Sequence, residues 1–343
     1  MKQPWINKKK YDLLFILAPP FVIAFIVIIF QQQILNIQNE FSFLNWLILI
    51  VCIDVAHVYA SIFKTYLVPT EFKKNQKLYL GIPIICFIIG TVAFLIGKNF
   101  FWSLLAYIAV FHFIRQQYGF MRLYARNEIK TPFSVIFDKV VIYNATLYPM
   151  LFWFLNPNRN FNWFVKNEFI QGTQPQILSY LNIIYIVILA CYIIKLLYNL
   201  IKIKYINEPK TLLILGTYIS WYLSIVHYNN ELIFTAFNVI SHGIPYMALV
   251  YFKEIKDAPS KKFAFKIQNH TGKLISFILI LIILAITEEF IWEVTVWEEH
   301  IQLNQSFYIP DFWQFLWVPL LALPQFTHYI LDGFIWKNKK SST

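Results

Sequence analysis

Residues 111–119 read FHFIRQQYG, so a histidine, an arginine and two amides follow directly on a long apolar stretch of the chain. Polar side chains at membrane depth are costly, and they usually face the interior of a helix bundle or a water-filled cavity, where they mark functional positions. Three other apolar stretches each carry one histidine at comparable depth: His57, His242 and His328. Together with His112, these residues predict a membrane protein organised around four imidazoles.

The composition excludes an ordinary soluble domain. Of the 343 residues, 58% are hydrophobic and only 14% are charged, whereas soluble domains are about 25% charged. We therefore predict an all-α fold, a polytopic bundle of about ten transmembrane helices in which residues 1–343 form a single integral membrane domain. The expected location is a cell membrane, and a bacterial inner membrane in particular.

The net charge of +11 is distributed in a way that indicates membrane topology and not nucleic-acid binding. The basic residues form short clusters between apolar stretches, and such clusters set the orientation of membrane spans. The three cysteines, Cys52, Cys86 and Cys191, lie in apolar stretches at unrelated spacings. They therefore predict neither a disulfide framework nor a cysteine metal site. The first apolar stretch lacks a small-residue cleavage site and is expected to remain as an anchor.

Ten apolar segments are candidate spans, for which roughly 20 residues suffice. Pro19 and Pro20 predict a kink or break inside the first. Basic clusters fall at every second boundary between spans, so both termini are expected in the cytoplasm. The segments are 13–30, 43–68, 78–97, 100–120, 135–155, 177–203, 212–226, 232–252, 274–297 and 312–336, of which 212–226 is the shortest.

The four histidines are expected at one depth. They fall on the second, fourth, eighth and tenth segments, which all run from outside to inside under this topology. Each precedes a cytoplasmic basic residue by roughly 7 to 11 positions, which corresponds to about 10–17 Å at a helical rise of about 1.5 Å per residue. The imidazoles can therefore meet within one narrow slab and are the predicted metal ligands.

Each histidine also has polar neighbours three or four residues away, on the same face of its helix. Histidines that bind metals usually give their second ring N–H to a carboxylate, a carbonyl or water, which fixes the tautomer of the ring. The residues expected to support the imidazoles in this way, or to bind the cofactor themselves, are Asp54, Asn238, Gln325 and Asp332.

Arg115 and Gln116 follow His112 on the same helix and are the candidate catalytic residues. A guanidinium near the membrane needs an anion, a carbonyl array or water, because its charge is not readily neutralised. Arg115 is expected either to clamp a carboxylate or phosphate of a substrate or to form an internal ion pair. The candidate partners for that pair are Asp54, Asp332 and Asp138.

An explanation without a ligand exists for each histidine. A single membrane histidine is more often a hydrogen-bond partner between helices than a metal ligand. Four histidines at one depth on spans of the same direction favour a shared metal or cofactor site. The chain has no HExxH sequence and no paired HxxxH boxes, so the pattern is informative only in aggregate.

Imidazole with carboxylate suits iron, zinc or copper, and the lack of a cysteine cluster argues against an iron–sulfur centre. Two aligned histidines would instead suit a haem. We favour the prediction of an iron-dependent oxidoreductase or oxygenase that acts on an apolar substrate, either a membrane lipid or an isoprenoid-like small molecule. An electron donor is expected as a further partner. A transporter that uses the same polar residues as a proton or ion pathway is the alternative outside enzymes.

The scattered histidines give the chain a resemblance, at the level of a class, to integral-membrane oxidoreductases, among them bacterial carotenoid-cleaving dioxygenases that use non-haem iron. The resemblance implies an iron-dependent oxidation of an apolar substrate. The chain lacks a paired-histidine motif by which residue roles could be transferred from a desaturase, hydroxylase or carotenoid-cleaving family.

Overall fold

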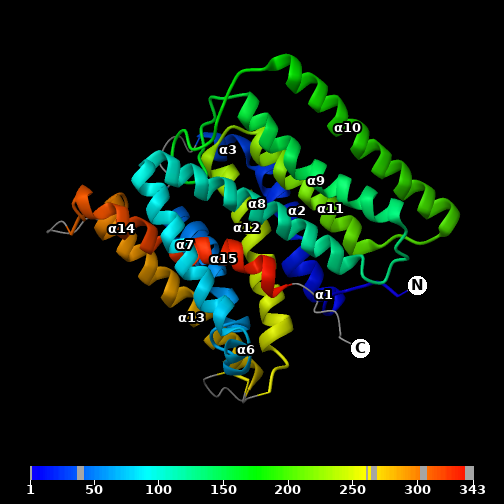
Figure 1. Ribbon diagram of the computed structural model, residues 1–343. Helices are drawn as coiled ribbons and strands as arrows, with labels where there is room; N and C mark the ends of the chain where they lie inside the picture. The colour runs from blue at the N-terminus through cyan, green and yellow to red at the C-terminus, as the bar shows by residue number, and fades with distance from the viewer. Residues whose placement is uncertain (1, 37–41, 260–261, 264–268, 302–306, 337–343) are drawn as a thin grey trace. The chain divides into compact units, whose positions relative to one another are not determined.

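The computed structural model describes residues 2–36, 42–259, 262–263, 269–301 and 307–336. Every regular element among them is a helix, as Figure 1 shows, so the all-α prediction is confirmed for this part of the chain. Helices are the expected form for such apolar segments, because each satisfies its own backbone polar groups without water.

The chain packs into two compact units. Unit 1 comprises Met1–Phe41 and Val110–Pro245, and unit 2 comprises Ser42–Ala109 and Tyr246–Thr343. Two helices, α8 (Lys98–Tyr124) and α12 (Glu231–Val250), contribute residues to both units without a break. The division does not test whether the chain forms a single membrane domain.

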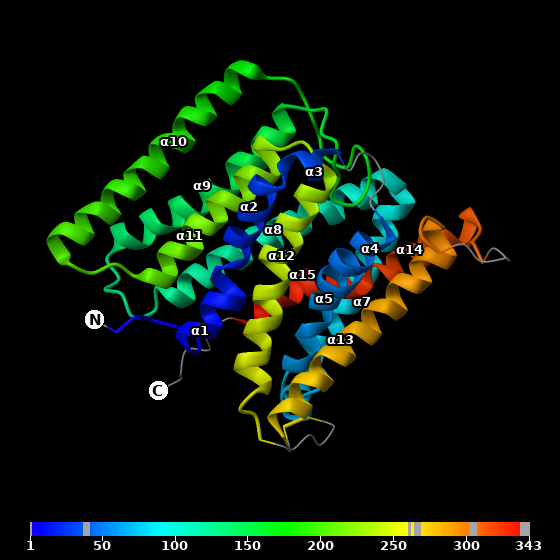
Figure 2. The same ribbon diagram turned by 180° about the vertical axis from the view of Figure 1, so that it is seen from behind.

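Unit 1 is built around α9 (Pro132–Leu155), which packs against both α10 (Pro175–Tyr198) and α11 (Glu208–Trp221). Helix α10 lies along α9 in both views (Figure 1, Figure 2) and is mostly exposed, as expected for an apolar helix that faces lipid. The remaining elements are α1 (Lys9–Asp12), η1 (Leu13–Leu17), α2 (Pro19–Ile29), α3 (Gln31–Asn36), η4 (Asn199–Ile203) and η5 (Tyr222–His227), with most of α12 and the second half of α8.

The kink expected in the first segment is confirmed. The helix Lys9–Leu17 and the helix Pro19–Ile29 meet at an angle of 51°. Pro19 and Pro20 lack amide hydrogens, so the hydrogen-bond ladder cannot continue through them. Gly216 of α11 accommodates the bend, because a Cβ at this position would lie only 2.8 Å from Cγ of Pro20.

Unit 2 pairs α13 (His270–Trp292) with η2 (Trp46–Val55) and α5 (Ala56–Ala60), and α7 (Gln76–Ile96) with α14 (Asp311–Leu321) and α15 (Leu323–Ile335). The remaining elements are α4 (Phe43–Asn45), η3 (Ser61–Lys64), α6 (Pro69–Lys74), η6 (Tyr251–Ile255) and η7 (Glu293–Trp297), with the first part of α8 and the end of α12.

Fewer helices qualify as spans than the ten expected. Within the described residues, six helices are long and apolar enough to cross a membrane, or seven if the kinked pair is one span. Segments 100–120 and 212–226 are helical, in α8 and in α11 with η5, but neither is among the qualifying helices. Six such helices are compatible with a membrane protein, and the orientation of the termini stays a prediction.

The tenth expected segment is two helices and not one. Helix α14 ends at Leu321 and α15 begins at Leu323, with Ala322 between them. Pro324 stands in the first turn of α15, where its missing amide hydrogen costs nothing, whereas the same residue would interrupt a continuous helix. The apolar composition of the segment hid this break.

Candidate metal centre

Unit 1 contributes one pair of histidines, His112 on α8 and His242 on α12. Both side chains are buried, with exposed fractions of 4% and 1%. Their ring centroids lie 5.1 Å apart with the planes at 77°. Phe113 stacks on the His242 ring at 3.5 Å, almost parallel, which fixes the orientation of that imidazole.

Gln116 supports this pair through the backbone. Its Nε2 donates a hydrogen bond of 2.9 Å to the carbonyl oxygen of His242. The bond ties the two helices together next to their histidines. This contact gives Gln116 a positioning role, and the catalytic role expected from the sequence stays a prediction.

Unit 2 contributes the second pair, His57 on α5 and His328 on α15, each only 1% exposed. Their ring centroids also lie 5.1 Å apart, with the planes at 81°. The span that carries His57 is a π-helix over the ten residues Trp46–Val55 and becomes α-helical at Ala56, one residue before His57. π-helical turns are rare and are frequent at functional sites.

Tyr246 joins this second pair to a carboxylate. Its ring centroid lies 6.0 Å from that of His57 and 5.0 Å from that of His328. Its hydroxyl donates a hydrogen bond of 2.6 Å to Oδ1 of Asp332. The same carboxylate oxygen lies 3.8 Å from Nδ1 of His328. Asp332 is therefore held beside an imidazole, and its supporting role stays a prediction.

Asp54 has the corresponding place beside His57, with 3.6 Å between its Oδ1 and Nδ1 of the ring. Both carboxylate distances exceed that of a direct hydrogen bond, so small side-chain rotations or a water would be needed to complete either contact. The two remaining candidates make no such contact among the described residues. Nδ2 of Asn238 is buried without a hydrogen-bond partner there, and Gln325 makes no hydrogen bond to His328.

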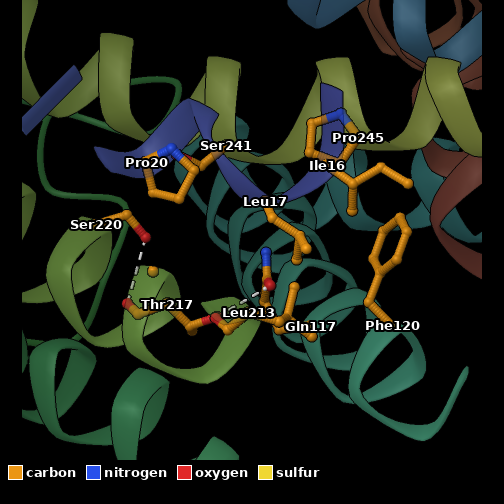
Figure 3. Close-up of a pocket in the computed structure, with 11 residues that line it drawn as sticks. Ile16, Leu17, Pro20, Gln117, Phe120, Leu213, Thr217, Ser220, Ser241 and Pro245 are labelled. Carbon is orange, nitrogen blue, oxygen red and sulfur yellow. Dashed lines mark hydrogen bonds between the residues drawn. The ribbon is translucent and has the colours of Figure 1, made fainter. Parts of the chain in front are cut away.

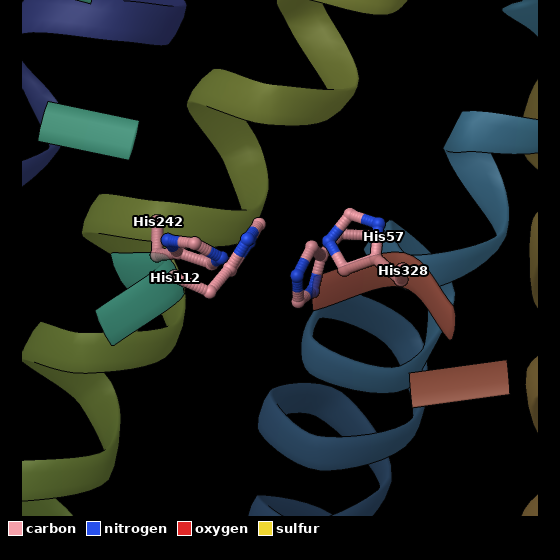
Figure 4. A group of neighbouring side chains, drawn as sticks. All are labelled: His57, His112, His242 and His328. Atoms are coloured by element: carbon pink, nitrogen blue, oxygen red, sulfur yellow. The ribbon is translucent and has the colours of Figure 1, made fainter. Parts of the chain in front are cut away.

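The four histidines predicted from the sequence are brought together, as Figure 4 shows. One ring nitrogen from each of His57, His112, His242 and His328 lies within 4.8 Å of the others, and all four side chains are buried, so the group could hold a metal ion. Two nitrogens on opposite sides of one ion are about 4.2 Å apart, because metal–imidazole bonds are about 2.0–2.1 Å long. The separation of the donor atoms is therefore comparable to that of two imidazole nitrogens bound to one ion.

Helix α12 carries both His242 and Tyr246, four residues apart. Residues at this spacing share one face of a helix.

Arg115 has a different environment from the one expected. Its side chain is exposed, and Nη1 donates a hydrogen bond of 3.1 Å to the hydroxyl of Tyr143. Asp138, one of its expected partners, instead binds Lys195 at 3.0 Å and Lys210 at 2.8 Å. The prediction of an ion pair between Arg115 and Asp138 is therefore wrong.

A small cavity with a mainly apolar lining lies within unit 1 (Figure 3). About 10 Å³ of it is open to the centre of a water molecule, and its polar walls include Gln117, Thr217 and Ser241. Pro20 and Pro245 also line it, and Pro245, which lies inside α12, lacks the amide hydrogen that would have bonded the carbonyl of Ser241. The space suits about one ordered water and is far smaller than a substrate pocket.

Two residues that organise the centre were missed in the sequence, Tyr246 and Phe113. The position of each in the sequence, close to a predicted metal ligand, could have identified it. Tyr246 stands four residues after His242, and Phe113 is adjacent to His112. Aromatic residues are so frequent in this chain that neither stood out as more than membrane packing.

Comparisons with protein-family profiles, with curated proteins and with solved structures found no match to this chain. Any functional conclusion therefore depends on the geometry of the chain itself.

Proposed function

We propose that the protein is an integral-membrane metalloenzyme in which His57, His112, His242 and His328 bind one iron ion. The observation that carries the proposal is the group of four buried imidazoles with a donor atom from each within 4.8 Å of the others. Each imidazole offers one ring nitrogen to the same small region, and imidazole is a common ligand of transition metals, so one ion would bind all four at once.

The donor set narrows the choice of metal. Imidazole suits iron, copper, zinc and nickel, whereas magnesium and calcium require oxygen ligands. The cysteines of the chain are free and none belongs to the group, which argues against sites selective for soft metals. A haem is a poorer fit, because its ring would have to occupy the space around the ion that the second pair of imidazoles fills.

Four imidazoles suit iron and zinc alike, and iron is proposed because it would allow the reaction expected from the sequence, oxidation of an apolar molecule that enters from the bilayer. A bound iron ion would supply one-electron redox chemistry, with dioxygen as oxidant and an electron donor where the reaction requires one. The role of this chain would be to fix four imidazoles by burial, to orient His242 through Gln116 and Phe113, and to hold a carboxylate beside His328.

Metal analysis of single alanine variants tests the proposal. Wild-type protein purified without added metal is expected to contain one iron per chain, and alanine at any of the four histidines should reduce the bound iron by an order of magnitude or more, because each removes a ligand. His227→Ala and His270→Ala remove exposed histidines outside the group and serve as matched controls.

Elemental analysis of each variant, together with its yield in the membrane fraction, separates loss of metal from loss of folding. Full metal content in all four variants would contradict a shared site. Zinc in place of iron would retain the site and contradict the redox chemistry.

A further inference from the structure

A cluster of basic and aromatic residues on unit 1 takes no part in the metal centre. It consists of Arg115 and Tyr118 on α8 and Lys139 and Tyr143 on α9, and we refer to it as the Arg115 patch. Arg115 donates to the Tyr143 hydroxyl at 3.1 Å, and its guanidinium carbon lies 5.2 Å from the centre of the Tyr118 ring. Lys139 Nζ lies 5.8 Å from the centre of the Tyr143 ring, so two cations converge on one tyrosine.

No carboxylate of the described residues neutralises these two cations. The acidic residue next to Lys139 is Asp138, and its two oxygens accept from Lys195 and Lys210. Arg115 and Lys139 make no ion pair among the residues that the structure describes, and both side chains are exposed. A permanent charge at or near membrane depth requires an anion or water, and none of the described residues supplies that anion.

The depth of the patch identifies the kind of partner. Arg115 lies nine residues before Tyr124 at the end of α8, and Lys139 lies seven residues after Pro132 at the start of α9. These intervals correspond to roughly 14 Å and 11 Å along their helices. In the predicted topology these helix ends lie at the cytoplasmic surface, and long basic side chains extend toward that surface, where the lipid phosphates lie.

We propose that the Arg115 patch binds the phosphate of one anionic phospholipid. The planar guanidinium can donate two parallel hydrogen bonds to phosphate oxygens, and Lys139 adds a second positive charge. The Tyr143 oxygen already accepts from Arg115, so its own hydrogen is available to a third group, and a phosphate oxygen fits. The proposal assigns Arg115 a role other than the catalytic one expected from the sequence, and it does not depend on metal at the histidines.

Native mass spectrometry of detergent-purified protein, titrated with phosphatidylglycerol or phosphatidylcholine, tests this proposal. The wild type is expected to retain one phosphatidylglycerol in preference to phosphatidylcholine. The double variant Arg115→Gln/Lys139→Gln should bind phosphatidylglycerol about 25-fold more weakly, since each basic residue near a membrane surface contributes about fivefold, or about 1 kcal/mol.

The double variant Lys73→Gln/Lys74→Gln is the matched control. It removes the same charge from two exposed lysines of unit 2 and should keep the affinity for phosphatidylglycerol. If the first double variant cannot be purified, Tyr143→Phe keeps both charges and should still weaken binding severalfold. Equal affinities in the patch variants and the control would overturn the proposal, as would displacement of the lipid by equimolar inorganic phosphate, which would make the site a free-anion site.

Discussion

Tyr246 is the residue that connects the carboxylate of Asp332 to the histidines of unit 2. Its ring packs against both His57 and His328, and its hydroxyl donates to Asp332 at 2.6 Å. The carboxylate is thereby held 3.8 Å from Nδ1 of His328. A carboxylate beside a metal-binding imidazole orients the ring and makes it a stronger donor.

Replacing Tyr246 by phenylalanine should lower metal affinity while keeping the packing of the ring. Without the hydroxyl, Asp332 is free to rotate away from His328, and losses of this kind are about 10- to 100-fold. Competition with a chelator measures the affinity directly.

Tyr66→Phe is the control for this change, because the Tyr66 hydroxyl donates to the backbone carbonyl of Tyr79 in the same unit at 2.7 Å. It should cost about 1 kcal/mol of stability, as for one hydrogen bond, and leave metal affinity unchanged. Equal metal affinities in the two variants would show that Tyr246 has only a packing role.

The sequence was informative about which residues converge and uninformative about their partners. Depth along a helix follows from counting residues, so the grouping of the four histidines could be predicted. The direction in which a side chain leaves its helix depends on how the helices are rotated about their axes, which apolar composition does not specify. Arg115 shows the consequence, since its hydrogen-bond partner is Tyr143 and not the expected Asp138.

At the scale of elements, unit 1 joins α9, α10 and α11 through a network of buried charges. Lys210 of α11 donates to Asp138 of α9 at 2.8 Å and to Glu128 at 2.7 Å. Lys195 of α10 contacts the other oxygen of Asp138 at 3.0 Å. The side chains of Lys210 and Asp138 are only 8% and 3% exposed, whereas that of Lys195 is 28% exposed.

Lys210→Met should therefore destabilise the protein far more than Lys195→Met. Removing Lys210 leaves two carboxylates without their central cation, and breaking a buried pair in this way costs about 3–5 kcal/mol. Lys195 is better hydrated and its loss should cost about 1 kcal/mol or less. The two variants are compared by their unfolding midpoints in the same detergent. Equal shifts of the midpoint would contradict the prediction, because Lys210 would then contribute no more to stability than Lys195.

Proline sets several helix boundaries in this chain, because it lacks the amide hydrogen that a continuous helix needs. Breaks in the spans were predicted correctly only where the prolines were considered. The pair Pro19–Pro20 predicted the kink that is observed. Pro324 was overlooked, and the expected tenth span is divided into α14 and α15. The overestimate of spans has a second origin, because the apolar content of α8 was weighed without its polar residues, and α8 is not among the qualifying helices.

At the scale of the whole molecule, α8 and α12 each carry one histidine of unit 1 and continue into unit 2. A metal ion that binds all four imidazoles would link residues from four separate regions of the sequence, from His57 to His328. Metal binding should then stabilise the entire fold, because an ion that binds only the folded state adds its binding free energy to stability. The orientation in the membrane stays a prediction from the basic clusters.

X-ray absorption spectroscopy at the edge of the bound metal tests the central claim most directly, because it counts the ligands of the ion. The account predicts one ion per chain, surrounded by about four imidazole nitrogens at about 2.0–2.1 Å. A chain purified without metal that also fails to take up iron, copper or zinc would contradict it. So would an ion bound by only two imidazoles, since the two histidine pairs would then be separate features of the fold.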